Sequence, residues 1–104
     1  MFDFLKKLFN IPTINLQELV QQGASIIDVR SASEFQSGHI PQSINIPIDQ
    51  IGNHIEKIKK MKQPIITCCA SGMRSAAAKA TLQAKGIENF NGGNWYSLQQ
   101  KIDS

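Results

Sequence analysis

The stretch PIITCCASGMRSAAAKATLQAKG, residues 64–86, decides the fold expected for this sequence. It opens with a compact apolar run, residues 64–67, of the kind found in strands that are buried on both faces. It ends with the alanine-rich segment 74–85, which predicts a stable helix, and with Gly86, a residue type that ends helices. The residues between them are mostly small and include Gly72. Residues 64–86 therefore predict a strand, a tight loop and a helix in direct succession.

The same alternation of strand and helix signals continues on both sides of this stretch. Strands are predicted at residues 13–14, 26–29, 44–46, 64–67 and 87–91, and helices at residues 16–22, 33–37, 48–60, 74–85 and 94–102. A turn is predicted at Gly92-Gly93, between the last strand and the last helix. Short strands that alternate with helices are typical of a parallel sheet covered on both faces. The sequence thus predicts an α/β fold with a central parallel sheet of about five strands and helices on both faces.

Length and composition are those of an ordinary globular domain. The chain has 104 residues, of which 41% are hydrophobic and 18% charged, and its net charge is +3. This charge is too small to indicate a nucleic-acid partner, and no apolar stretch approaches the ~20 residues that span a bilayer. We therefore expect no nucleic-acid binding and no membrane span, and a monomer is compatible with the sequence.

The chain is expected to divide into an N-terminal segment and one domain. Residues 1–12 combine apolar side chains with two lysines, which predicts a short amphipathic segment. Because the lysines interrupt the apolar run, this segment does not have the pattern of a signal peptide. Residues 13–104 contain all the predicted strands and form the domain.

The only two cysteines, Cys68 and Cys69, are adjacent. Neighbouring cysteines close no useful loop, so no disulfide framework is expected, and the sequence lacks a four-ligand pattern for structural zinc. We expect neither a metal nor another cofactor. Cysteines without a disulfide framework fit a reducing, cytoplasmic setting.

The loop that follows residues 64–67 is expected at the edge of the sheet where ligands bind, because parallel strands place binding sites beyond their carboxyl ends. Its small residues allow several backbone N–H groups to converge, and the next helix adds the positive end of its dipole. Such a loop binds anions and lowers the pKa of a cysteine thiol. A cysteine at its start is a candidate nucleophile; the alternative is that both cysteines are unreactive, buried apolar side chains.

The loop resembles the active-site loop of the rhodanese family of sulfurtransferases, in which Cys is followed by two residues, Gly, one residue, Arg and Ser. Here this pattern is Cys69-Ala70-Ser71-Gly72-Met73-Arg74-Ser75. Further matches follow the order of the family: Asp28-Val29-Arg30, Glu34-Phe35, Gly38-His39-Ile40-Pro41, Ile44-Asn45-Ile46-Pro47 and Gly92-Gly93. One departure is Trp95, since the family tryptophan usually lies farther beyond the Gly-Gly pair.

The resemblance implies a rhodanese-like fold and sulfur transfer through Cys69. Cys69 would attack the outer sulfur of a small anionic donor such as thiosulfate and become a persulfide. A thiol, cyanide or a protein would then accept that sulfur. Backbone amides of the substrate-binding residues would stabilise the thiolate and the bound anion. These residues are Ala70, Ser71, Gly72, Met73 and Arg74.

Three further residues are expected to support the loop without reacting: Asp28, Arg30 and Ser75. Arg30 and Glu34 are four residues apart and would pair if their turn is helical. For Arg74 the sequence leaves two roles open. Its guanidinium either binds an anionic donor or turns outward and holds the shape of the loop.

Two other functions stay open at this point. Cysteine phosphatases use a loop of Cys, five residues and Arg, which fits Cys68 to Arg74. Their loops usually carry Gly three residues after the Cys and His just before it, whereas Cys68 has Ser71 and Thr67 there. If Cys68 ends the strand, its side chain points away from the loop. The second alternative is a non-catalytic rhodanese-like module for binding or regulation, although such modules lack the cysteine that this chain keeps.

Overall fold

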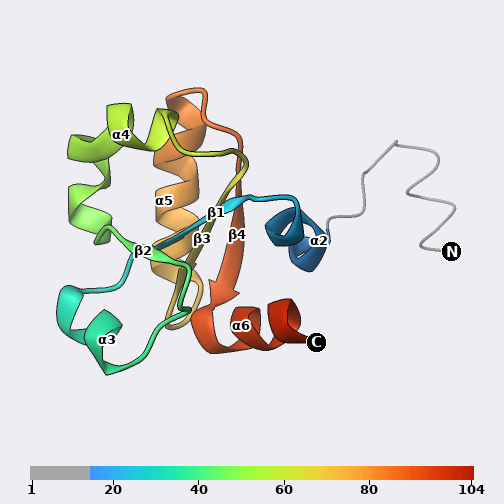
Figure 1. Cartoon of the computed structure of the whole chain (residues 1–104). Helices are drawn as coiled ribbons and strands as arrows, with labels where there is room; N and C mark the ends of the chain where they lie inside the picture. Colours follow the sequence, from blue (N-terminus) through green and yellow to red (C-terminus); the bar gives the residue numbers. More distant parts are fainter. Residues whose placement is uncertain (1–14) are drawn as a thin grey trace, which may run out of the picture.

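Four parallel strands form the sheet in the described part of the molecule. The computed structural model describes residues 15–104, so the predicted segment 1–12 and the predicted strand 13–14 lie outside the described residues. The strands are β1 (Ser25–Asp28), β2 (Ile44–Asn45), β3 (Ile65–Cys69) and β4 (Asn89–Asn94). They pair in the order β2-β1-β3-β4, and every pair is parallel. The predicted α/β fold is confirmed, with four strands among the described residues where about five were expected for the chain (Figure 1).

Helices cover both faces of this sheet (Figure 1). They are α2 (Leu16–Gln21), α3 (Ala32–Ser37), the 3₁₀ helix η1 (Ile48–His54), α4 (Ile55–Lys59), α5 (Met73–Ala84) and α6 (Trp95–Asp103). The helix predicted over 48–60 is therefore divided into a 3₁₀ part and an α-helical part. The poor helix formers Gly52 and Asn53 lie in the 3₁₀ part. Across residues 15–104, no helix combines the length and hydrophobicity that a membrane span requires.

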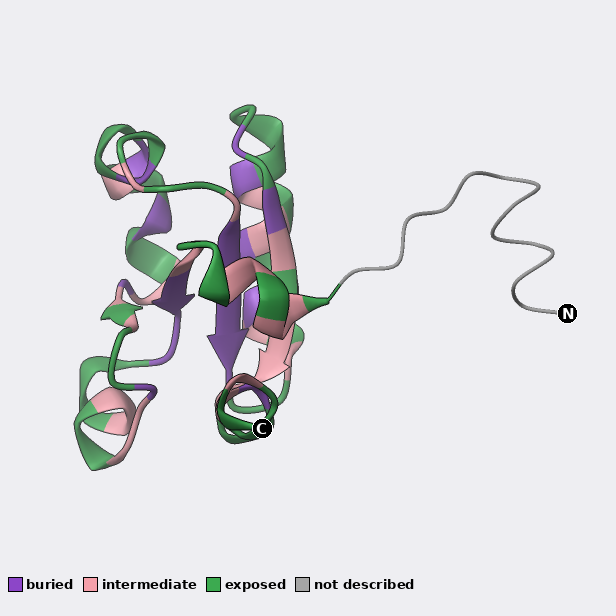
Figure 2. Ribbon diagram, turned by 45° about the vertical axis from the view of Figure 1, so that its right-hand side comes forward, coloured by how far each residue is buried: buried purple, intermediate pink, exposed green. Residues whose placement is uncertain are grey.

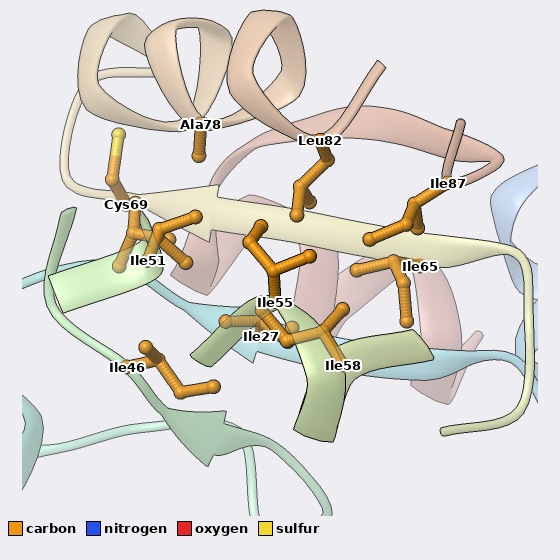
Figure 3. Close-up of a cluster of buried hydrophobic side chains, with 11 residues drawn as sticks. Ile27, Ile46, Ile51, Ile55, Ile58, Ile65, Cys69, Ala78, Leu82 and Ile87 are labelled. Atoms are coloured by element: carbon orange, nitrogen blue, oxygen red, sulfur yellow. The ribbon is translucent and has the colours of Figure 1, made fainter. Parts of the chain in front are cut away.

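Strand β3 is buried along its whole length (Figure 2). Its side chains alternate between the two faces of the sheet, with Ile65 in one core cluster and Ile66 in the other. Cys69 belongs to the core cluster that packs against Leu82 of α5 (Figure 3). Cys68 belongs to the opposite cluster, together with Leu98 of α6. The two adjacent cysteines therefore point to opposite faces, as strand alternation predicts.

Strand β4 is longer toward its carboxyl end than the sequence suggests. The turn expected at Gly92-Gly93 is wrong, because both glycines lie inside β4, which continues to Asn94. The pairing of β3 with β4 is irregular between Thr67 and Cys69, and Gly93 has a φ of 78°. A left-handed glycine at such an irregularity lets the strand continue through two residues that more often form a turn.

Gly92 lies where β4 approaches both its neighbouring strand and α6 closely. A Cβ at this position would lie 2.9 Å from three atoms, Ile66 Cγ2, Leu98 Cδ2 and the carbonyl oxygen of Thr67. We expect Gly92→Ala to lower the free energy of unfolding by about 1–3 kcal/mol, because overpacking displaces backbone and core side chains. Denaturant unfolding measures this. Gly52→Ala is the control, since a Cβ at Gly52 has nothing within 4 Å. Equal stability of the Gly92 variant and the wild type would contradict the close approach.

Candidate active site

The loop between β3 and α5 lies at the carboxyl end of the sheet, where β3 ends at Cys69 and α5 begins at Met73. Gly72 makes the turn. Its φ is 93°, in the left-handed region that favours glycine, and a Cβ there would lie 3.5 Å from the Cα of Gly93 in β4. This turn directs the N–H groups of Gly72 and Ser75 toward the end of the strand, with Cys69 at the base of the loop.

Three hydrogen-bonding groups converge on the sulfur of Cys69. The backbone N–H of Gly72 donates to Sγ at 2.9 Å, and the N–H of Ser75 donates to it at 3.4 Å. The hydroxyl oxygen of Ser75 lies 3.4 Å from the same sulfur. Burial opposes ionisation, but hydrogen bonds from Ser75, Gly72 and Ser71 lower the pKa of the Cys69 thiol below its ordinary value. The loop therefore favours the thiolate, which is the nucleophilic form of a cysteine.

The remaining loop residues lie at the surface. Ala70 and Ser71 are exposed, whereas Cys69 is buried, so the thiol lies directly beneath the loop. Of the amides expected to bind a substrate, the one of Gly72 contacts the sulfur. The amide of Met73 donates instead to the hydroxyl of Ser71 at 3.4 Å.

Cys68 has the opposite electrostatic environment. Its side chain is buried in the cluster on the α6 side of the sheet. Desolvation, and next the negative charge of Asp28, raises the pKa of Cys68 to about 12. Its thiol is therefore neutral near pH 7 and unsuited to nucleophilic attack.

Two asparagines of β4, which no sequence pattern singled out, hold the loop through hydrogen bonds. The buried Ser75 donates its hydroxyl proton to Oδ1 of Asn91 at 2.6 Å. Nδ2 of Asn91 donates to the carbonyl of Gly72 at 3.1 Å, and Nδ2 of Asn94 donates to the carbonyl of Ala70 at 2.6 Å. They could have been predicted from their position at the carboxyl end of β4, because β4 is the strand next to β3.

Arg74 is paired with a carboxylate from α3. Its two terminal nitrogens donate to the two carboxylate oxygens of Glu34 at 2.7 and 2.9 Å. The hydrogen bond from Arg74, followed by the one from the Ser31 backbone, lowers the pKa of Glu34 to about 2. Ser31 and Glu34 also form a capping box at the start of α3. The guanidinium of Arg74 thus joins the first turn of α5 to the first turn of α3.

Asp28 and Arg30 form a second ion pair, which is buried. Nη2 of Arg30 lies 2.8 Å from Oδ2 of Asp28 and donates to the carbonyl of Gly38 at 2.6 Å. The guanidinium also lies 4.8 Å from the centroid of the Trp95 ring.

The expected pair of Arg30 with Glu34 is wrong, because Arg30 precedes α3 and is outside its helical geometry. Within the described part of the chain, neither Asp28 nor Arg30 is hydrogen-bonded to the loop above Cys69.

The histidine of the upstream motif does not contact the thiol. Nδ1 of His39 lies 2.6 Å from the carbonyl oxygen of Phe35, and the two rings are stacked with centroids 3.7 Å apart. Among residues 15–104, no group of three His, Cys, Asp or Glu side chains is placed to hold a metal ion. The groups that contact the sulfur of Cys69 are the N–H groups of Gly72 and Ser75 and the hydroxyl of Ser75.

Comparison with known proteins identifies the family. The family model described as the rhodanese-like domain matches residues 13–94. Thiosulfate sulfurtransferase GlpE of Pseudomonas savastanoi pv. phaseolicola is 37% identical over 79 residues, which cover 76% of this chain and 74% of that relative.

Two crystal structures resemble the fold. The reduced Bacillus anthracis CoADR-RHD is 30% identical with a TM-score of 0.71, covering 88% of this chain but only 17% of that one. The rhodanese-like domain protein from Staphylococcus aureus is 28% identical with a TM-score of 0.66, covering 93% of this chain and 85% of that one. Since the family model spans most of the sequence and both structures share the fold, this chain belongs to the rhodanese-like domain family.

Proposed function

We propose that this protein is a sulfurtransferase that carries sulfur as a persulfide on Cys69. The observation that carries the proposal is the convergence of the Gly72 and Ser75 N–H groups on Sγ, which lowers the pKa of that thiol. The Pseudomonas relative named a thiosulfate sulfurtransferase supports the reaction class.

The first half-reaction loads the enzyme. The thiolate of Cys69 attacks the outer sulfur of a donor such as thiosulfate, and a new S–S bond forms to Sγ. The bond between that outer sulfur and the sulfonate sulfur breaks, and sulfite leaves with the bonding electron pair. The negative charge now resides on the terminal sulfur of the persulfide, where N–H donors of loop 70–74 can stabilise it.

The second half-reaction discharges the enzyme. A thiophilic acceptor such as cyanide or a thiolate attacks the terminal sulfur, and the bond from that sulfur to Sγ breaks. The electron pair returns to Sγ, so the thiolate of Cys69 is regenerated. The N–H groups of Gly72 and Ser75 that lower the pKa of this thiol also make it a better leaving group.

Neither arginine near the loop offers an unpaired charge to the donor. Arg30 is bound by Asp28, and Arg74 is bound by both oxygens of Glu34. We infer that the backbone dipoles of the loop provide most of the attraction for an anionic donor. Arg74 is then a positioning residue that fixes the start of α5.

The competing phosphatase mechanism requires Cys68 as the nucleophile. Desolvation raises the pKa of Cys68 to about 12, and its side chain packs on the α6 side of the sheet. Neither property suits attack on a phosphate bound in the loop. If the wild type gains no sulfur in the following experiment, the result would favour a non-catalytic binding module.

Cys69→Ser should abolish persulfide formation, because a serine hydroxyl is not ionised at neutral pH and forms no persulfide. Intact mass after thiosulfate treatment should show a gain of about 32 Da in the wild type, lost again on adding cyanide. Cys68→Ser is the matched control and should keep this gain, with reduced stability from a hydroxyl in a packed strand. If Cys68 and not Cys69 were required, the assignment of the nucleophile would be wrong.

Iodoacetamide should modify Cys69 with a half-maximal rate at a pH below the ~8.5 of a free cysteine. The folded loop lowers the pKa of this thiol, so the reactive thiolate is present at lower pH than in the unfolded chain. Cys68 should stay unmodified until the protein unfolds. Peptide mass spectrometry across pH measures both sites, and sulfate should slow the reaction at Cys69 by occupying the loop. Ordinary titration of Cys69 without protection by anions would contradict the proposal.

Arg74→Ala should lower kcat at least about tenfold with a smaller change in KM for thiosulfate, because a displaced loop misplaces the thiolate. Steady-state kinetics with thiosulfate and cyanide measure both constants. Lys85→Ala, which removes an exposed positive charge just beyond the far end of α5, serves as the control for net charge. A raised KM with unchanged kcat would instead show that Arg74 binds the donor directly.

A further inference from the structure

Asn91 occupies a central position beside the proposed nucleophile without touching it. Its Oδ1 accepts the hydroxyl of Ser75 at 2.6 Å and the backbone N–H of Gly93 at 2.9 Å. Its Nδ2 donates to the carbonyl of Gly72 at 3.1 Å. Asn91 therefore contacts both residues whose N–H groups reach the sulfur of Cys69, namely Gly72 and Ser75.

The hydroxyl of Ser75 has one proton and two acceptors within reach. Oδ1 of Asn91 lies at 2.6 Å and Sγ of Cys69 at 3.4 Å. Because a hydroxyl donates only one hydrogen bond, the two acceptors compete for it. While Sγ is protonated, its S–H can donate to Ser75 and the hydroxyl can donate to Asn91. Once Sγ is a thiolate, it becomes the stronger acceptor.

We propose that Asn91 is a positioning residue that controls the direction of the Ser75 hydroxyl during sulfur transfer. The hydroxyl donates to Asn91 while Sγ carries no charge, as in the thiol and the persulfide. It turns to Sγ when the thiolate forms. The persulfide part of this scheme rests on the proposed function, whereas the thiol–thiolate part depends only on the contacts of Ser75.

Replacing Asn91 with a residue that lacks the acceptor should change the rates of the two half-reactions in opposite directions. During loading, negative charge leaves Sγ for the terminal sulfur, and the Ser75 hydroxyl returns to Asn91. During discharge, the electron pair returns to Sγ, and the hydroxyl turns back to it. Without the acceptor of Asn91 the hydroxyl stays on Sγ. The thiolate is then more stable, so it is a weaker nucleophile and a better leaving group.

Two charged or titratable groups are electrostatically coupled to Cys69, namely Arg74 of α5 and the neighbouring Cys68, which points to the opposite face of the sheet. Arg74 is itself paired with Glu34 of α3, and Cys68 is coupled to Asp28 of β1 and to Arg30, which form their own ion pair. None of these residues is replaced in an Asn91 variant, and Asn91→Ala adds no charge. A change in the titration of Cys69 in that variant can therefore be assigned to the lost contacts of Asn91.

Two substitutions separate this role from simple anchoring of the loop. Asn91→Ala and Asn91→Asp both lose the amide that donates to Gly72, but only Asp keeps an acceptor for the Ser75 hydroxyl. The alanine variant should lower the pKa of Cys69 by about half a unit to one unit. The aspartate variant should raise it, because its carboxylate holds the Ser75 hydroxyl and adds a negative charge near the sulfur. The pH dependence of iodoacetamide modification measures these shifts. Shifts in the same direction, or no shift in either variant, would overturn the proposal.

Two matched variants sharpen this test. In a Ser75→Ala background, Asn91→Ala should no longer shift the pKa of Cys69, because the connecting hydroxyl is absent. Asn94→Ser removes the amide that donates to Ala70 and keeps an oxygen that can cap α6, so it perturbs the loop without touching Ser75. It should leave the pKa of Cys69 unchanged. An Asn94 variant that reproduced the shift of Asn91→Ala would show that loop anchoring alone is responsible.

Single-turnover kinetics test the persulfide part separately. At a pH where Cys69 is fully ionised in both proteins, Asn91→Ala should load sulfur from thiosulfate about two- to threefold more slowly and discharge it to cyanide about two- to threefold faster. A fall in both rates would indicate a purely structural role and overturn this part. If the wild type gained no sulfur at all, the proposed function would fail, while the alkylation shifts would still decide the role of Asn91 at the thiol.

Discussion

The left-handed turn at Gly72 is the constraint on which the rest of the site depends. With a φ of 93°, the chain reverses immediately after β3, and the Gly72 amide comes within 2.9 Å of the sulfur of Cys69. The same reversal starts α5 at Met73, which brings the Ser75 amide to the same sulfur. Burial by itself would raise the pKa of this thiol, so the lowered pKa is a direct consequence of the turn.

The two salt bridges near the site join separate elements of the fold. The pair of Arg74 with Glu34 is about one-third exposed, and pairs of that kind contribute little to stability. Its bidentate geometry nevertheless joins α5 to α3. The buried pair of Asp28 and Arg30 connects β1 to the turn after α3 through the carbonyl of Gly38.

Local signals in the sequence predicted the fold well, because apolar runs and helix formers act over short distances. The buried strand β3, the helix that follows it and the opposite orientations of Cys68 and Cys69 all follow from such signals. The prediction was wrong at Gly92-Gly93, which lie within β4 and not in a turn. Two glycines allow either conformation, and the close approach of β3 and α6 to Gly92 decides between them.

The sequence by itself determined which residues form the loop above Cys69, since the spacing from Cys69 to Ser75 lies within one continuous segment. Only the tertiary structure decided the partners of that loop. Arg74 of α5 pairs with Glu34, forty residues earlier in the chain, and Ser75 of α5 contacts Asn91 of β4. These contacts arise because parallel strands end at one edge of the sheet, which brings together loops from distant parts of the chain. Charge and spacing along a sequence do not specify which carboxylate or amide will lie opposite a given side chain.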